Sequence, residues 1–220
     1  REIDADVRYM LSRGERRITL SYPDGFLTRE YVQQLMNVFL STARGFVEQT
    51  YNSVECSYSL RSGSVIVTFS SSLYGGDQLD SYREATIQYA VAVHDKLWED
   101  GVITAGMTEY DKARAYFTWI CENCTYDFDG AGVDSSMSHS GYRAFAEGTA
   151  VCDGYTAAYN LLLKLEGINC TTRSAESHIW TVAELDGVSY HIDTTWGTQT
   201  GTVAYRYFAM TEADSMARFQ

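Results

Sequence analysis

The sequence has no apolar run near the roughly 20 residues that a membrane-spanning helix needs, so we expect no membrane insertion. It is also short of positive charge: 17 Lys and Arg residues stand against 29 Asp and Glu residues, a formal net charge of −12 at pH 7. Nucleic acids and anionic lipids bind basic surfaces, so this balance argues against both as partners. The chain begins at Arg1 without an initiator Met, a signal peptide or an anchor, which indicates a processed product or a piece of something longer.

Metal-binding patterns are scarce as well. Cys121 and Cys124 form a Cys-x-x-Cys pair, but no second Cys or His pair follows at the spacing of a zinc site. We therefore expect neither a metal nor a cofactor. The sequence also shows no internal repeat.

Length and composition predict a folded globule. The chain has 220 residues, of which 45% are hydrophobic and 14% aromatic, including 17 tyrosines. Such a chain can bury a substantial core, and its length fits one domain or one domain with an N-terminal elaboration.

The segment around Cys152 is the most informative one. After it, apolar residues from Tyr155 to Leu165 recur at spacings of three and four, which predicts one buried face of a helix that Gly167 ends. Cys152 then lies in the first turn, where backbone N–H groups and the helix dipole stabilise a negative sulfur. The same N–H groups, that of Cys152 first, are candidate donors to an oxyanion on a substrate.

A predicted hairpin supplies an imidazole and a carboxylate. Two β-prone runs, residues 179–185 and 188–196, flank Asp186-Gly187, which is a strong signal for a two-residue turn. If the turn is tight, residues pair symmetrically about it.

This pairing places His178 opposite Thr195, with Asp193 one diagonal step away on the same face, about 5 to 7 Å off. We therefore predict that Asp193 holds the His178 ring in one tautomer. His191 shares that face farther along, opposite Val182, and we expect it to be structural or exposed to solvent.

These segments resemble the motif blocks of the transglutaminase-like superfamily, bacterial type, whose fold is related to that of papain. The three blocks are Ala150-Val-Cys152-Asp-Gly-Tyr155, His178-Ile-Trp180 and Tyr190-His-Ile-Asp193-Thr-Thr-Trp196. The resemblance covers about half of the chain, roughly residues 108 to 210, and implies a catalytic triad of Cys152, His178 and Asp193. The departures are modest: Thr181 stands where many members have Asn, and Thr194 where many have Pro or Val.

The resemblance implies an α+β, papain-like fold in which the nucleophile helix packs on an antiparallel sheet. We expect residues 76–220 to form this catalytic core and residues 1–75 to form an N-terminal α/β elaboration that carries no chemical motif. The implied activity is that of a cysteine-nucleophile enzyme that acts on amide bonds of peptides or proteins through a thioester. We favour hydrolysis over acyl transfer, because polar residues 127–141 edge the cleft and no bulky apolar lid would exclude water.

Two alternatives remain open. One is a non-catalytic binding or structural module of a cell-surface protein, which loss of a triad residue would favour. The other is a redox protein that uses Cys121 and Cys124, which requires an exposed, reducible pair.

Other side chains near the motifs are expected to assist the site or to pack beside it. The second oxyanion donor is expected to be one of three aromatic residues: Tyr126, Tyr142 or Trp119. We expect Trp180 and Trp196 to pack beside the site rather than to contact the substrate. No partner is predicted for His94 or His139.

Four cysteines accompany the nucleophile: Cys56, Cys121, Cys124 and Cys170. They allow two disulfides in any of three pairings. Together with the missing start and the lack of a membrane span, they indicate an extracytoplasmic domain, secreted or displayed at the cell surface, with at least one disulfide. Four thiols in a reducing cytoplasm are the alternative.

Periodicity and turn residues give the remaining elements. The pattern predicts strands at residues 18–22, 53–60 and 64–71, and helices at 29–43, 82–98 and 109–121. Thr28 is the expected N-cap of the first helix, and Gly75-Gly76 marks the expected internal boundary.

Overall fold

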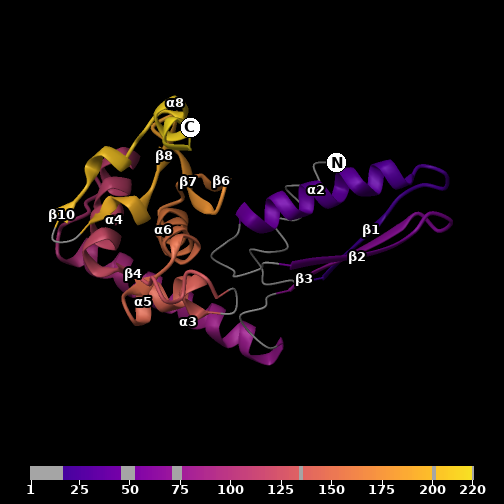
Figure 1. The fold of residues 1–220 in the computed structure, drawn as a ribbon, viewed down its shortest axis with the longest axis horizontal. Coiled ribbons are helices and arrows are strands. Elements are labelled where there is room, and N and C mark those ends of the chain that lie inside the picture. The colour runs from indigo at the N-terminus through magenta and orange to yellow at the C-terminus, as the bar shows by residue number, and fades with distance from the viewer. Residues whose placement is uncertain (1–16, 46–52, 71–75, 134–135, 200–201, 220) are drawn as a thin grey trace.

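The structure, a computed structural model, describes residues 17–45, 53–70, 76–133, 136–199 and 202–219 of the chain. Figure 1 shows these residues in two lobes: β1 to β3 with α2 form one, and the elements from α3 onward form the other. The α-helices are α2 (Arg29–Gly45), α3 (Gly76–Glu99), α4 (Glu109–Asn123), α5 (Gly141–Ala146), α6 (Cys152–Leu165), α7 (Thr194–Gly197) and α8 (Glu212–Met216).

The strands are β1 (Arg17–Ser21), β2 (Ser53–Ser59), β3 (Ser64–Ser70), β4 (Thr125–Tyr126), β5 (Thr149–Ala150), β6 (Cys170–Ala175), β7 (His178–Leu185), β8 (Val188–Ile192), β9 (Thr198–Gln199) and β10 (Thr202–Val203). The short 3₁₀-helices are η2 (Met137–His139), η3 (Tyr205–Tyr207) and η4 (Ala217–Phe219).

The N-terminal lobe is an antiparallel sheet, ordered β1-β3-β2, with α2 packed against one face. Every second residue of β3 is apolar, so Val65, Val67 and Phe69 all point into the buried cluster between sheet and helix. The Thr28 hydroxyl accepts a hydrogen bond from the Tyr31 N–H (3.1 Å) and caps α2, as the sequence predicts.

Helix α6 lies in the middle of the C-terminal lobe (Figure 1). The apolar spacing predicts one buried face, but every residue from 154 to 163 is buried. The reason is that α3, α4 and α5 contact this helix together with β7 of the sheet. Its C-terminal end is held by Glu166, whose carboxylate accepts hydrogen bonds from Trp98 Nε1 (2.6 Å), Tyr116 Oη (2.7 Å) and Lys112 Nζ (2.8 Å).

The second antiparallel sheet has the order β6-β7-β8. Asp186 (φ 51°) and Gly187 (φ 81°) both have the left-handed conformation of a two-residue hairpin turn, and the flanking strands pair symmetrically about them, from Leu185 with Val188 to Thr181 with Ile192. The predicted hairpin register is therefore confirmed over β7 and β8.

The prediction of a strand through residue 196 is wrong. The ladder ends at Ile192, because the Asp193 carboxylate caps α7 by accepting a hydrogen bond from the Trp196 N–H (3.0 Å). Thr195 is therefore helical, and His178 pairs with Ala175 of β6 instead of facing Thr195.

These elements form the predicted α+β fold, with the Cys152 helix packed on an antiparallel sheet. Each lobe has its own buried apolar cluster, yet Tyr82 and Met137, which lie after the predicted boundary, pack against the N-terminal cluster. Gly75 falls outside the described residues and Gly76 begins α3, so the boundary itself stays a prediction.

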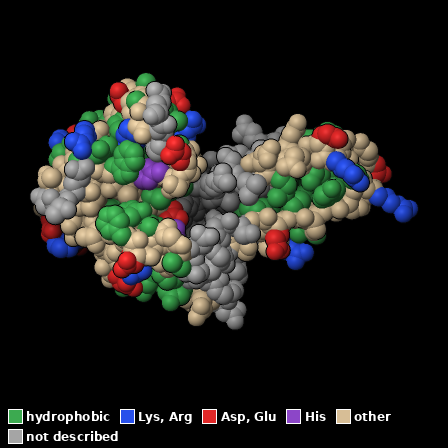
Figure 2. Space-filling view, viewed as in Figure 1, with side chains coloured by type: hydrophobic (Ala, Val, Ile, Leu, Met, Phe, Trp, Pro, Cys, Tyr) green, Lys and Arg blue, Asp and Glu red, His purple; other side chains and the backbone are tan. Residues whose placement is uncertain are grey.

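The surface agrees with the charge balance of the sequence. In Figure 2, Lys and Arg side chains are dispersed over the face in view, among acidic ones, rather than gathered into one broad basic patch. Within the described residues, no helix is both long and apolar enough to cross a bilayer.

The first turn of α6 packs tightly against η2. The Ser138 carbonyl oxygen accepts a hydrogen bond from the Val151 N–H (2.9 Å), directly before Cys152. A Cβ added at Gly154 would overlap that carbonyl oxygen and would lie 3.0 Å from the Ser140 carbonyl oxygen. Only glycine allows this close approach, so Gly154 helps to fix the position of Cys152.

We predict that Gly154→Ala destabilises the fold by about 1–3 kcal/mol, because the methyl group must displace backbone rather than a flexible side chain. Urea unfolding followed by circular dichroism measures this loss. Gly106→Ala is the matched control, since a Cβ there meets nothing within 4 Å. Equal stability of the two variants would contradict the tight packing of η2 on α6.

Candidate active site

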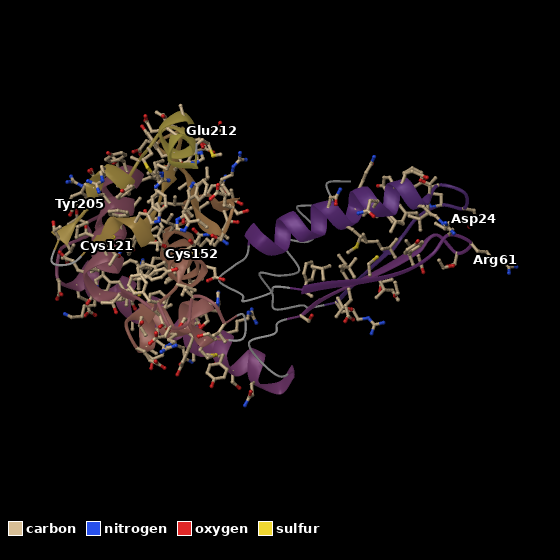
Figure 3. All side chains as sticks on the ribbon, in the orientation of Figure 1. Asp24, Arg61, Cys121, Cys152, Tyr205 and Glu212 are labelled. Carbon is tan, nitrogen blue, oxygen red and sulfur yellow. The ribbon has the colours of Figure 1, made fainter. Side chains whose placement is uncertain are left out.

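Cys152 is the first residue of α6, and its side chain is partly exposed. Its sulfur lies 3.9 Å from the Ser177 carbonyl oxygen, beside the first residue of β7. Figure 3 places Cys152 and Cys121 in the same lobe, far from the tip of the other lobe at Asp24 and Arg61. The helix start thus presents the thiol at the edge of the β7 sheet.

His178 and Asp193 meet as the sequence predicts. The Nε2 atom of His178 donates a hydrogen bond to Asp193 Oδ2 at 2.8 Å, and the Asp193 side chain is fully buried. The His178 ring stacks on the rings of Trp196 (centroids 5.0 Å apart) and Trp180 (5.9 Å). The imidazole is therefore held at its edge by the carboxylate and at its face by aromatic rings.

The surroundings of His178 favour its charged form. Burial lowers the pKa of His178, but hydrogen bonds to Asp193 and Cys152 outweigh this effect and raise the pKa to about 9. Because Nε2 is bonded to Asp193, the other ring nitrogen, Nδ1, is the one left for the thiol. The arrangement can thus hold an imidazolium beside the Cys152 sulfur at neutral pH.

Asp193 accepts two hydrogen bonds besides the one from His178. Its Oδ1 atom accepts from the Trp196 N–H, and its Oδ2 atom also accepts from Arg218 Nη1 at 3.1 Å. Arg218 lies 25 residues beyond Asp193 in the chain and comes from η4. No local spacing in the sequence indicates this contact.

A cleft of about 420 Å³ opens beside His178. The described residues that line it are mainly aromatic: Tyr126, Phe128, His178, Thr195, Trp196, Thr198 and Tyr207. Trp180 is buried as expected, but Trp196 both packs on His178 and lines the cleft.

Tyr126 is the best placed of the three aromatic residues named as oxyanion donors. Strand β4 pairs it with Ala150, two residues before Cys152, and it lines the cleft. Burial, followed by the charges of Cys152 and Asp153, raises the pKa of Tyr126, so its hydroxyl keeps the proton and can donate it in a hydrogen bond. By contrast, Tyr142 packs on Tyr82 and Tyr89, and Trp119 packs on Phe145.

One family model matches a little less than half of the chain. The model of the transglutaminase-like superfamily matches residues 96–191, a stretch that contains Cys152 and His178 and ends just before Asp193. The chain carries a transglutaminase-like superfamily domain.

Two curated relatives match part of the chain. Human Kyphoscoliosis peptidase is 24% identical over 119 residues, which cover 47% of this chain and 18% of that protein. Mouse Kyphoscoliosis peptidase is 23% identical over 106 residues, 41% of this chain and 16% of that protein. The chain thus matches less than a fifth of the length of these relatives.

Solved structures were compared as well. A TGase crystal structure aligns with a TM-score of 0.43 at 16% identity, over 90% of this chain and 55% of that chain. A cysteine-protease candidate from Cytophaga hutchinsonii aligns with a TM-score of 0.38 at 15% identity, over 70% of this chain and 64% of that chain.

The other three histidines, all within the described residues, have partners as well. His139 Nδ1 lies 2.8 Å from Asp153 Oδ2, and His94 contacts Asp95 (2.9 Å) and Glu166 (3.2 Å), although the sequence predicts no partner for either histidine. His191 is buried and structural: its Nδ1 accepts a hydrogen bond from Trp180 Nε1 (2.9 Å). Burial lowers the pKa of His191, so this ring stays neutral as an acceptor.

The expectation of a disulfide is wrong for this structure, in which all five cysteines are thiols. The cysteines lie in separate surroundings: the Cys121 sulfur faces the Thr194 carbonyl oxygen (3.5 Å), the Cys170 sulfur faces the Asn160 carbonyl oxygen (3.6 Å), and Cys56 belongs to the other lobe. The extracytoplasmic location stays a prediction.

The redox alternative requires Cys121 and Cys124 to be exposed, and both are buried. Burial raises the pKa of each thiol to about 12, which suppresses thiolate chemistry at neutral pH. Within the described residues, no group of three or more His, Cys, Asp or Glu side chains is placed to hold a metal ion.

We predict that iodoacetamide modifies Cys152 at pH 6 faster than any other cysteine of the chain, because the His178 imidazolium stabilises a thiolate there. Peptide mapping by mass spectrometry gives the rate at each cysteine. In His178→Ala the labelling of Cys152 at pH 6 should fall at least tenfold, while that of Cys56 stays unchanged. Equal rates at Cys152 and Cys56 in the wild-type protein would show that Cys152 is not activated.

Proposed function

We propose that this protein is a cysteine-nucleophile enzyme that acts on amide bonds of peptides or proteins, with Cys152, His178 and Asp193 as its catalytic residues. One observation carries the proposal: the His178 ring is hydrogen-bonded through Nε2 to a fully buried carboxylate and lies close enough to a thiol at a helix N-terminus for that thiol to help raise the pKa of His178. This arrangement supplies an activated nucleophile, a proton donor and an orienting group.

The first half-reaction forms a thioester. The Cys152 thiolate attacks the amide carbonyl carbon, and the oxyanion is stabilised by the Cys152 N–H and the Tyr126 hydroxyl. The His178 imidazolium gives its Nδ1 proton to the amide nitrogen as the C–N bond breaks, which releases the amine. His178 is then neutral, and its Nε2–H remains on Asp193.

The second half-reaction regenerates the thiolate. Neutral His178 accepts a proton from an incoming nucleophile, which attacks the thioester carbon and expels Cys152. Water as the nucleophile gives a carboxylic acid and completes hydrolysis. A primary amine gives a new amide and completes acyl transfer.

We favour hydrolysis. The cleft edge near the triad includes Phe128, which is 82% exposed and packs edge-on against Tyr126. Behind it the segment is polar: the Asp127 carboxylate accepts hydrogen bonds from the Gly130 N–H (3.0 Å), Arg143 Nη1 (3.1 Å) and the Ser138 hydroxyl. A rim of this kind leaves the thioester accessible to water, whereas efficient transfer to an amine requires that water be kept out.

The cleft also favours one kind of peptide. Among the described lining residues, Tyr126, Phe128, Trp196 and Tyr207 are aromatic, and none is a carboxylate or a primary ammonium group. An apolar or aromatic side chain next to the reactive amide would bury its surface against these rings, whereas a positively charged one would lose its hydration without gaining a partner. The word peptidase in the names of the curated relatives agrees with a peptide substrate.

We predict that incubation with a mixed peptide library and a labelled primary amine yields more hydrolysed products than amine adducts. Products should be enriched in peptides with an aromatic or apolar residue beside the cleaved amide, because the cleft walls are aromatic. Mass spectrometry identifies both kinds of product, and Cys152→Ser should form neither.

Phe128→Ala should weaken the aromatic preference, and Phe26→Ala is the matched control, since Phe26 is an exposed Phe of the other lobe. An excess of amine adducts would establish acyl transfer instead. No product at all, with Cys152 still readily alkylated, would leave the non-catalytic module as the better account.

A further inference from the structure

Arg218 is a nearly buried cation at the back of the triad. Its side chain, on η4, is 14% exposed, and its Nη1 atom lies 3.1 Å from Oδ2 of the fully buried Asp193. A guanidinium loses much of its hydration in such a place and is retained only with good partners. The ion pair with Asp193 provides one.

The remaining edges of the Arg218 guanidinium are anchored as well. Nε donates a hydrogen bond to the Ser215 carbonyl oxygen (3.1 Å), and Nη2 donates to the Ser215 hydroxyl (3.0 Å). The guanidinium carbon lies 4.4 Å from the centre of the Trp196 ring and 5.4 Å from that of Tyr207. Because the group is planar and held on several sides, the direction in which Nη1 points is fixed.

Arg218 and His178 bind the same carboxylate oxygen, Oδ2 of Asp193. Asp193 Oδ2 accepts from both His178 Nε2 and Arg218 Nη1, while Oδ1 accepts from the Trp196 N–H. A rotation of the carboxylate would break at least one of these bonds. The orientation of the imidazole therefore depends on that of the guanidinium.

Charge couples the two side chains as well. The positive guanidinium offsets the carboxylate charge that favours the imidazolium, so its removal should raise the pKa of His178. The titratable or charged groups grouped around this ring come from four elements and one cap: Cys152 (α6), Tyr126 (β4), Tyr207 (η3), Arg218 (η4) and Asp193 (the cap of α7).

We propose that Arg218 is a positioning residue of the active site, which fixes the Asp193 carboxylate and through it the orientation and charge of His178. Its effect on turnover rests on the proposed function, whereas its effect on the titration of His178 does not.

Three variants separate this role from mere packing. Arg218→Met removes the charge and the hydrogen bonds, and Arg218→Lys keeps the charge but loses the planar fork. Arg206→Met is the matched control, because Arg206 also lies over the Tyr207 ring (4.8 Å), is exposed, and is not among the residues bonded to Asp193. Circular dichroism establishes that each variant is folded.

The titration of His178 is followed by NMR of the imidazole. In Arg218→Met its pKa should rise by about 1 unit, the lower end of the effect of a nearby charge. In Arg218→Lys and Arg206→Met it should stay at the wild-type value. With a peptide substrate found by the library experiment, kcat should fall up to about 100-fold in both Arg218 variants, with little change in KM, and not in Arg206→Met.

A double-mutant cycle tests whether Arg218 acts on His178 through the Asp193 carboxylate. In the Asp193→Asn background, Arg218→Met should change the pKa of His178 far less than it does in the wild-type protein. An unchanged pKa in Arg218→Met, or an equal shift in the Asn background, would overturn the proposal. If Arg218→Met does not fold, wild-type kcat in Arg218→Lys would overturn it. A wild-type protein without turnover would refute the proposed function, while the pKa shift would still decide the role of Arg218.

Discussion

The arrangement of the candidate active site depends on one fully buried carboxylate, that of Asp193. A buried negative charge must be satisfied by hydrogen bonds and positive charge, and three donors meet this requirement: His178 Nε2, Arg218 Nη1 and the Trp196 N–H. Each donor comes from a different element. The carboxylate therefore ties the β7 sheet, the α7 turn and the C-terminal η4 segment together at the same point at which it orients the imidazole.

The position of Cys152, the proposed nucleophile, is fixed by different contacts. Helix α6 is buried along most of its length, held at one end by the Glu166 carboxylate and at the other by the close packing of Gly154 on Ser138. The thiol therefore sits on a rigid element, and the imidazole on the first residue of a central strand. Chemistry that needs atoms aligned within a fraction of an ångström is served by rigid elements of this kind.

The sequence predicts those parts of the site that follow from local rules. The start of α6 at Cys152 and the hairpin turn at Asp186-Gly187 follow from periodicity and turn residues. The contact of His178 with Asp193 is predicted too, but it forms at the cap of α7 rather than by strand pairing, because the ladder ends at Ile192. Those rules extend β8 too far. Strand periodicity does not show that Asp193 both caps α7 and binds His178, and these two roles end the strand at Ile192. Arg218 joins the site through tertiary packing across 25 residues, which no spacing reveals. The choice of Tyr126 likewise depends on its parallel pairing with Ala150, a contact that is not local.

We infer that Asp193 holds His178 as an imidazolium, bonded through Nε2, beside the Cys152 thiol. Nitrogen-15 NMR of the histidine side chains measures this most directly, because it reports both the pKa of the ring and the nitrogen that keeps its proton once the ring is neutral. We expect a pKa for His178 near 9 in the wild-type protein, with the proton retained on Nε2. A pKa at or below the ordinary value of about 6.5, or a neutral ring protonated on Nδ1, would contradict this account of the site.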